Sequence, residues 1–316
     1  MPASRFRAAV PAAAGVLWLA ACGGGGAATP DASFDAAGPP DSLCAVPAGR
    51  AAVYHQIRIL PPGEGFDLDG DGAVDNEIGR LPPAVLSAAH AGIDQSLATG
   101  ELVVLYLVTG WSEPPTPDDP DVVFYGLSGY DGDMPNNPAN NFTGMGEFYV
   151  RLDQFDLSCR PTTQADETAL AGGVLTARAH RWAFQLTTGT GALTIDEVIA
   201  VTTWDPTWAA SSSRIGGRMS LCSLASLPFP GDTPGTALDA FANDPSIAAA
   251  VQPDVDVDGD GLEQVIGDGV SILKCIDGDG TTEIPGRDCP CHPSIVDAYS
   301  VGLRMDAVGA RIIGVF

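Results

Sequence analysis

The chain has almost no lysine and little positive charge of any kind. Lys274 is the single lysine, and 15 Lys and Arg residues face 40 Asp and Glu residues, for a formal net charge of −25 at pH 7. Phosphate backbones are bound mainly by basic side chains, so this shortage excludes a nucleic-acid partner. Glu is also scarce, with 9 residues against 31 Asp. The short Asp side chain suits tight turns and oxygen coordination of cations.

The sequence also lacks recognisable catalytic motifs. There is no glycine-rich phosphate loop of the Walker or Rossmann type, and the segment Gly126-Leu-Ser128-Gly129 is not the Gly-x-Ser-x-Gly nucleophile turn. The four histidines are scattered along the chain. We therefore assign no catalytic residue and expect a protein without enzymatic activity, while a hydrolase whose site is not visible in one sequence stays an alternative.

The only long apolar run lies at the N-terminus. Arg5 and Arg7 precede an apolar stretch over residues 8–21, which is shorter than the roughly 20 residues needed to span a bilayer and therefore indicates a signal peptide. The run ends in Leu-Ala-Ala-Cys22, which resembles the bacterial lipobox. The resemblance implies cleavage before Cys22, a lipid on its thiol, and an extracytoplasmic protein whose partner is the membrane. Gly23, where Asp would favour the inner membrane, implies the outer membrane.

Differences in composition along the chain predict its division into segments. With 45% hydrophobic and 17% charged residues, the protein is expected to fold rather than to be a disordered acidic chain. We expect a signal peptide over 1–22, and a flexible tether rich in Gly, Ala, Pro and Asp over 23–43. A β-rich domain should follow over 44–252, and residues 253–316 should supply an Asp-rich calcium segment and the closing strands of the same domain.

The cysteine count is odd, and lipidation of Cys22 would leave an even number. In an oxidising compartment the remaining six predict up to three disulfides, with Cys275 paired to Cys289 or Cys291 across a short loop. A zinc knuckle at Cys289-Pro-Cys291-His292 is disfavoured because no second pair has the right spacing. The six are Cys44, Cys159, Cys222, Cys275, Cys289 and Cys291.

Hydrophobic periodicity predicts mainly β structure. Helical spacing occurs over Pro83–Ala98, and an Ala-rich stretch over Thr236–Val251 indicates a second, shorter helix. The fold class is therefore an antiparallel sandwich or barrel-like domain with one or two helices and Asp-rich calcium loops. The expected strands are Val53–Leu60, Leu102–Val108, Asp121–Leu127, Gly146–Phe155, Val174–Leu186, Ala192–Thr203, Arg214–Leu224, Asp297–Asp306 and Gly309–Phe316.

The segment Asp67-Leu-Asp-Gly-Asp-Gly-Ala-Val-Asp75 is the strongest chemical signal. Calcium takes six to eight oxygen ligands, and Asp at positions 1, 3 and 5 of a curled loop sends three carboxylates to one point. Gly72 permits the sharp turn at position 6. The segment resembles the calcium loops of EF-hand, dockerin and thrombospondin type 3 proteins, and the ligands it predicts are Asp67, Asp69, Asp71, the carbonyl of Ala73, and Asp75.

Two features depart from those loops. Ile78 stands at position 12, where a bidentate acid is expected, and prolines at 61 and 62 exclude an ordinary entering helix. We therefore predict a strand–loop–helix version with a dissociation constant of ~10⁻⁴–10⁻³ M. Val74 occupies the position at which such loops pack an apolar side chain.

A second Asp-rich run covers residues 254–279 and resembles the linear repeats of thrombospondin type 3 proteins. The bland alternative, for both segments, is that Asp-Gly pairs simply form solvated turns. Against it, closely spaced carboxylates repel one another unless a cation joins them. The predicted calcium ligands of this run are Asp256, Asp258, Asp260, Asp268, Asp277 and Asp279.

As a whole the organisation resembles that of bacterial surface lipoproteins, which implies no particular activity. The first hypothesis is a calcium-stabilised, membrane-anchored protein with a structural or adhesion role and a surface polysaccharide or protein as partner. The second is a carbohydrate-binding module, with ordinary packing as the simpler account of its aromatic residues. Those residues are Trp111, Tyr125, Tyr130, Trp204 and Trp208.

Overall fold

A computed structural model describes residues 44–112, 116–133, 137–185, 192–205, 207, 209–220, 223–224, 228–229, 235–236, 244–251, 254–255 and 298–316. The helical elements are η1 (Glu77–Arg80), α1 (Pro83–Thr99), η2 (Pro138–Asn140), η3 (Leu152–Gln154) and α4 (Pro245–Ala248). The strands are β1 (Arg50–Ile59), β2 (Val104–Thr109), β3 (Val123–Asp131), β4 (Gly146–Val150), β5 (Glu167–Ala171), β6 (Val174–Gln185), β7 (Ala192–Trp204), β8 (Ala210–Met219), β9 (Pro228–Phe229), β10 (Gly235–Thr236) and β11 (Tyr299–Val315).

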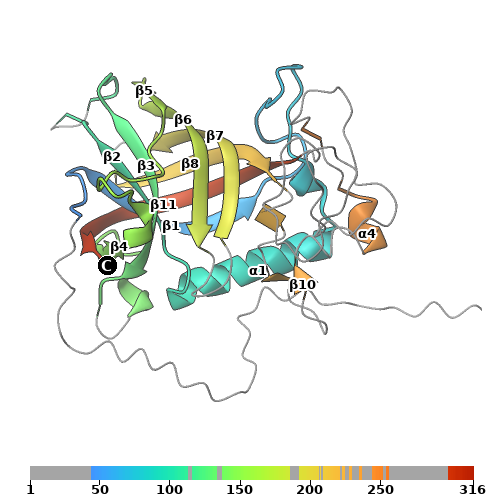
Figure 1. The fold of residues 1–316 in the computed structure, drawn as a ribbon, viewed down its shortest axis with the longest axis horizontal. Helices are drawn as coiled ribbons and strands as arrows, with labels where there is room; N and C mark the ends of the chain where they lie inside the picture. The colour runs from blue at the N-terminus through green and yellow to red at the C-terminus, as the bar shows by residue number, and fades with distance from the viewer. Residues whose placement is uncertain are drawn as a thin grey trace, which may run out of the picture.

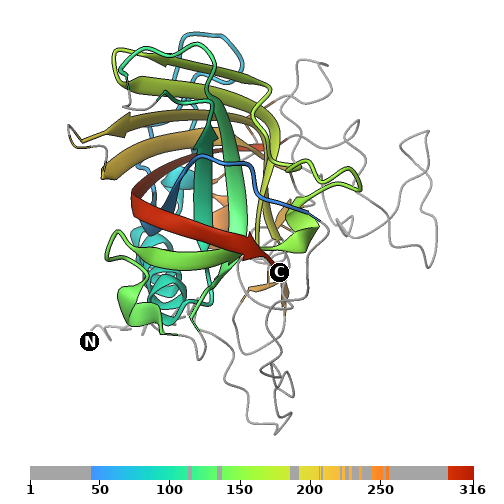
Figure 2. The same cartoon turned by 90° about the vertical axis from the view of Figure 1, so that its left-hand side faces the viewer.

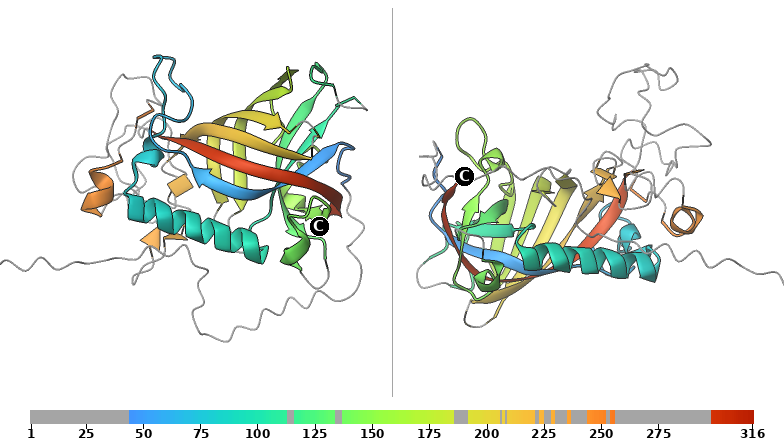
Figure 3. Two further views of the ribbon diagram at one scale, coloured as in Figure 1. Left: turned by 180° about the vertical axis from the view of Figure 1, so that it is seen from behind. Right: turned by 90° about the horizontal axis from the view of Figure 1, so that it is seen from below.

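Nine of these strands form one sheet, which confirms the mainly β prediction (Figure 1). Its order is β1-β2-β3-β4-β11-β8-β7-β6-β5, with a further pairing of β1 to β11. The last strand of the chain therefore lies in the middle of the sheet, beside the first. Figure 3 shows β1 and β11 running side by side, with α1 next to them.

The sheet curls until its edges meet. β1 pairs with β2 on one side and with β11 on the other, while β5 at the far edge approaches the start of β3. Two antiparallel bridges, Tyr125 with Gln164 and Asp119 with Leu170, join these edges. The path β11-β1-β2-β3-β5-β6-β7-β8 thus closes on itself, which gives the expected barrel-like form.

The expectation of a purely antiparallel sheet is wrong at one pairing. The end of β11 runs parallel to β4, with Ala310 opposite Gly146. Figure 2 shows β11 curving round until its end lies against β4. The reason is topological: β1, β2, β3, β4 and β11 form a closed ring of five, and strands that alternate in direction cannot close an odd ring without one parallel pair.

Two apolar cores share the wall made by β1, β2, β3 and β11. On β2, Val104, Tyr106 and Val108 face the larger core, whereas Leu105 and Leu107 face the smaller one inside the ring of five. A strand buried on both faces needs a continuous apolar sequence rather than an alternating one, which explains the run over residues 102–108.

Several element boundaries differ from the sequence prediction. The expected strand to Phe155 ends at Val150 and is followed by η3, and the two expected C-terminal strands are one continuous strand, β11. Strand β5 was not predicted at all. The helix expected from Thr236 is wrong at its start, since Thr236 lies in β10, and its described helical part is α4.

Helix α1 follows its sequence signals closely. Pro occupies the first turn and Gly100 ends the helix in the left-handed conformation, with φ of 73°. Arg58 of β1 makes a bidentate ion pair with Asp94, and the Ile59 N–H donates to His90 Nε2 at 3.0 Å. Burial and the charge of Arg58 lower the pKa of His90, which keeps this ring nitrogen an acceptor. Within the described residues no helix is long and apolar enough to cross a membrane.

Candidate cation site

The Asp-rich loop is closed by a short antiparallel bridge. It follows β1, and the backbone N–H of Asp75 donates to the Phe66 carbonyl at 2.8 Å, so residues 67–74 form a curl with its ends side by side. The predicted strand–loop–helix arrangement is confirmed here, because the chain enters from β1 and leaves through η1 toward α1.

Three of the predicted ligands converge. Asp67, Asp69 and Asp71 are exposed, and each offers one carboxylate oxygen that lies within 4.8 Å of the other two. Both oxygens of Asp67 accept backbone N–H groups, from Gly70 at 2.6 Å and Gly72 at 3.0 Å. Asp69 and Asp71 each accept one such bond two residues further on. The curl is thus held by its own carboxylates, and the oxygens retain lone pairs for a cation.

Two glycines make the curl possible. Gly70 and Gly72 have φ of 83° and 88°, the left-handed region in which a side chain strains the backbone. The regular spacing of Asp and Gly in the sequence therefore reflects local geometry, because left-handed Gly70 and Gly72 on either side of Asp71 let the chain curl around the three converging carboxylates.

Asp75 is placed differently from the first three. Its Oδ2 accepts the Leu68 N–H at 2.6 Å, across the neck of the loop, and it is not a member of the group within 4.8 Å. Partial burial raises the pKa of Asp75, and the charges of Asp69, Asp71 and Asp67 raise it further. The loop thus has a negative potential that extends to its base. The backbone N–H of Ala73, whose carbonyl was the predicted ligand, donates to Asp71 Oδ1 at 2.6 Å.

The loop base is fixed by Asn76, a residue that the sequence analysis missed. Asn76 is 4% exposed, and its Nδ2 donates to the carbonyls of Leu60, Pro61 and Glu64 at 2.8 to 3.1 Å. Its Oδ1 accepts the Gly302 N–H of β11 at 2.8 Å. A single Asn after an Asp-rich motif carries no sequence signal for this role, because its four partners come from two distant segments.

Aromatic contacts seat the loop on the outer face of the sheet. The ring of Phe66 lies under the guanidinium of Arg214, 5.6 Å from it, and would collide with any Cβ at Gly216. A small pocket of about 70 Å³ remains between loop and sheet. Its walls come from Asp67, Leu68, Arg178, Glu197, Ile199, Arg218 and Val255.

The second Asp-rich run begins beside the first. Both Asp254 oxygens accept hydrogen bonds from Ser300 of β11, one from its N–H at 2.7 Å and one from its Oγ–H. Ser300 Oγ in turn accepts the Glu77 N–H at 2.7 Å. Burial raises the pKa of Asp254 to about 6, with smaller contributions from the charges of Glu77 and Asp75. The predicted ligands Asp256, Asp258, Asp260, Asp268, Asp277 and Asp279 lie outside the described residues.

Two positions depart from EF-hand-like loops. Val74, expected to pack, is 45% exposed, because the loop turns its apolar position toward solvent; that expectation is wrong. Ile78, at position 12, is 3% exposed in the larger core, and Glu77 pairs with Arg80 at 2.8 Å. The bidentate ligand missing from the sequence is therefore not supplied at this position.

The aromatic residues considered for carbohydrate binding lie mostly inside. Trp111 and Tyr125 are buried, and Trp204 is half-buried with its indole N–H donating to Tyr106 Oη at 3.1 Å. The rings of Trp111 and Trp204 are 4.8 Å apart. Trp208 lies outside the described residues. Packing accounts for the described members of this group.

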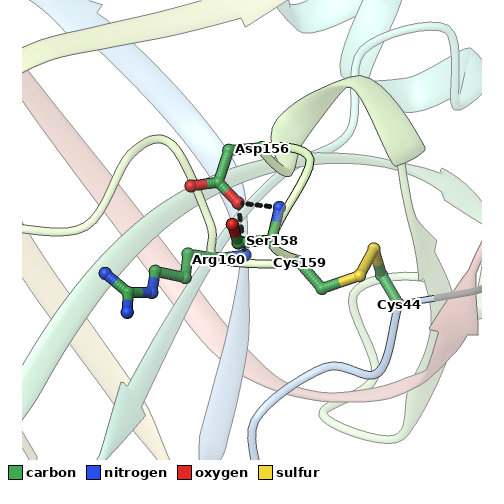
Figure 4. Close-up of a disulfide and its surroundings, with 5 residues drawn as sticks. All are labelled: Cys44, Asp156, Ser158, Cys159 and Arg160. Carbon is green, nitrogen blue, oxygen red and sulfur yellow. Dashed lines mark hydrogen bonds between the residues drawn. A yellow bond between two sulfur atoms is a disulfide. The ribbon is translucent and has the colours of Figure 1, made fainter.

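A disulfide joins Cys44 to Cys159, with Cα atoms 5.0 Å apart (Figure 4). The cysteine count predicted up to three disulfides and left this pairing open. The bond joins the start of the described chain to a turn after η3. There the Asp156 carboxylate accepts the backbone N–H groups of Ser158 and Arg160. Both hydrogen bonds lower the pKa of Asp156, and the bond from Arg160 has the larger effect. The pairing expected from the sequence, Cys275 with Cys289 or Cys291, lies outside the described residues, as does Cys22.

Comparison with protein-family models, with curated proteins and with solved structures finds no match to this chain.

Proposed function

We propose that the protein binds calcium at Asp67, Asp69 and Asp71, and that the ion stabilises a lipid-anchored extracytoplasmic β domain with a structural or adhesion role. The observation that carries the proposal is the convergence of three exposed carboxylates within 4.8 Å on one curl. Among the described residues no ion pair involves any of the three. Like charges this close repel, and a divalent cation would convert the repulsion into attraction.

The chemistry of the loop favours calcium over softer metals. Carboxylate oxygens alone converge here, without His or Cys, and such ligands suit hard cations. With Ile78 in place of an acid at position 12, we expect weak binding, which suits an environment where calcium is abundant. The Cys44–Cys159 disulfide supports an oxidising, extracytoplasmic compartment, in line with the lipobox-like sequence at Cys22.

A calcium titration of thermal unfolding tests the proposal. At a hundredfold excess over its dissociation constant, calcium should stabilise the protein by ~2.7 kcal/mol. The variant Asp67→Asn/Asp69→Asn/Asp71→Asn should lose most of this response, whereas the exposed Asp121→Asn should keep it. An equal response of the triple variant and the unchanged chain would refute binding at this loop.

The lipid anchor is tested separately. Cells that express the chain should incorporate labelled palmitate into it, and Cys22→Ser should abolish incorporation while export continues. Label retained by the variant would disprove attachment at Cys22.

A further inference from the structure

The connection between β3 and β4 holds a second cluster of oxygen ligands, far along the chain from the Asp67 loop. β3 ends at Asp131, β4 begins at Gly146, and η2 lies between them. Asp131 stands opposite Phe148, and the Gly132 N–H donates to the Glu147 carbonyl at 2.7 Å. The base of the connection is therefore fixed by strand pairing.

Hydrogen bonds join one side of this connection to the other. Asp131 Oδ1 accepts the Asp133 N–H at 2.9 Å, and Asp133 Oδ2 accepts from the amide Nδ2 of Asn140 at 2.6 Å. The second bond fixes the orientation of the Asn140 amide, because only its nitrogen can donate. Asp133 is thus linked to Asp131 through its backbone N–H and to Asn140 through its carboxylate.

Several polar atoms here are buried without a hydrogen-bond partner. They are Oδ2 of Asp131, Oδ1 of Asn140, and both amide atoms of Asn141, whose residue is 1% exposed. Four of the eight such atoms in the described structure belong to these three residues. Buried polar groups in native proteins are nearly always satisfied, so this concentration points to a ligand of the fold.

The charge of the cluster decides which kind of ligand. No ion pair among the described residues involves Asp131 or Asp133, so the carboxylates share about two negative charges with no basic side chain to offset them. Water would satisfy the orphaned oxygens but leave the charge uncompensated. A divalent cation would coordinate the three unpartnered oxygens and also offset the negative charge, and a mixed set of Asp and Asn oxygens is typical of calcium.

We propose that Asp131, Asp133, Asn140 and Asn141 form a calcium site where the β3–β4 connection leaves the sheet. Asp131 Oδ2 and Asn140 Oδ1 are the first ligands, and Asn141 contributes its amide oxygen. The site shares no residue with the Asp67 loop and does not depend on the function proposed for that loop.

The test starts from the full chain carrying Asp67→Asn/Asp69→Asn/Asp71→Asn, so that the two sites are separated. Equilibrium dialysis with calcium counts bound ions in this background, with and without Asp131→Asn. The added substitution should remove about one ion per chain, whereas Asn137→Ala, at an exposed position of the same connection, should remove none. An unchanged ion count after Asp131→Asn would overturn the proposal.

A second measurement needs no variant at all. Crystals of the unchanged chain soaked in terbium, which replaces calcium, should give an anomalous peak within ligand distance of Asp131 Oδ2 and Asn140 Oδ1. An ordered water alone at that position would overturn the proposal as surely as an unchanged ion count.

Discussion

The two oxygen-rich loops of this protein are held in opposite ways. In the loop from Asp67 to Asp75 the carboxylates of Asp67, Asp69 and Asp71 are exposed, and all four aspartates accept backbone N–H groups of the same loop. In the β3–β4 connection the oxygens are buried, and several accept nothing. The first loop can therefore hold its shape without a ligand, whereas the second carries the desolvation cost of buried polar atoms that have no partner within the protein.

Two buried asparagines, one in each loop region, show the same difference in hydrogen bonding. Asn76 and Asn141 are 4% and 1% exposed, yet Asn76 makes four side-chain hydrogen bonds while neither amide atom of Asn141 has a partner. An asparagine of similar burial thus stabilises the fold through hydrogen bonds at position 76, whereas at position 141 its amide makes no hydrogen bond within the protein.

The largest expected effect comes from truncating this pair. Asn76→Ala strips partners from the carbonyls of Leu60 and Glu64 and from the Gly302 N–H, and should lower the free energy of unfolding by about 3 kcal/mol. Asn141→Ala, with calcium chelated, loses no hydrogen bond and should cost under about 1 kcal/mol. Urea denaturation of both variants in chelator measures the difference, and equal losses would show that Asn141 supports the fold as much as Asn76 does.

Backbone conformation gives the next effect. Gly72 has φ of 88° with nothing within 4 Å of a Cβ built there, so Gly72→Ala adds strain without collision. We expect a loss of about 1 kcal/mol, measured by thermal unfolding without calcium. Gly72→Asn is the control, because Asn tolerates the left-handed region and should cost less. A larger loss for Asn than for Ala would show that side-chain space, not φ, matters at this position.

The raised pKa of Asp254, at the start of the second Asp-rich run, makes the stability of the protein depend on pH. Burial first, then Glu77 and Asp75, raise this pKa to about 6, so the folded protein binds this proton more tightly than the unfolded chain does. Its contribution to stability is full below the unfolded pKa near ~4 and is lost as the pH rises through 6. Because the side chain is partly exposed, we expect only about 1 kcal/mol across this window.

Asp254→Asn should flatten the stability profile between pH 4 and pH 6 by that amount. Saturating calcium should reduce this slope only slightly in the unchanged chain, because burial is the main cause of the raised pKa and an ion at the Asp67 loop would offset only the smaller contribution of nearby negative charge. Urea titrations at several pH values measure both effects. If the variant kept the full slope, another carboxyl would be responsible.

The first loop was predictable from sequence and the second was not, for a physical reason. Asp67, Asp69 and Asp71 meet because the backbone curls locally, and a local curl leaves a regular spacing. Asp133 and Asn140 meet because β3 and β4 pair at the base of their connection, and no regular spacing in the sequence indicates that pairing.

The same distinction applies to the fold. The apolar run over 102–108 and the caps of α1 are local signals, and both elements were predicted. The parallel pairing of β11 with β4 depends on five strands that close a ring, and it contradicts the local expectation. Asn76 was missed because its importance comes from carbonyls far apart in the sequence.

The smallest expected effect tests how far the resemblance to EF-hand-like loops extends. In such loops the apolar position packs against the protein, and its replacement by a polar residue would weaken both fold and calcium binding. Here Val74 is 45% exposed, so Val74→Ser removes no buried surface and should change the free energy of unfolding by less than ~0.5 kcal/mol. Calcium affinity, measured by titration calorimetry, should also stay the same. Ile78→Ser supplies the contrast, because its buried side chain contributes to the larger core and its loss should be severe. If Val74→Ser instead reduced calcium affinity severalfold, the loop would have to close over Val74 when the ion binds, and the first loop would resemble the second in needing its ligand to complete its shape.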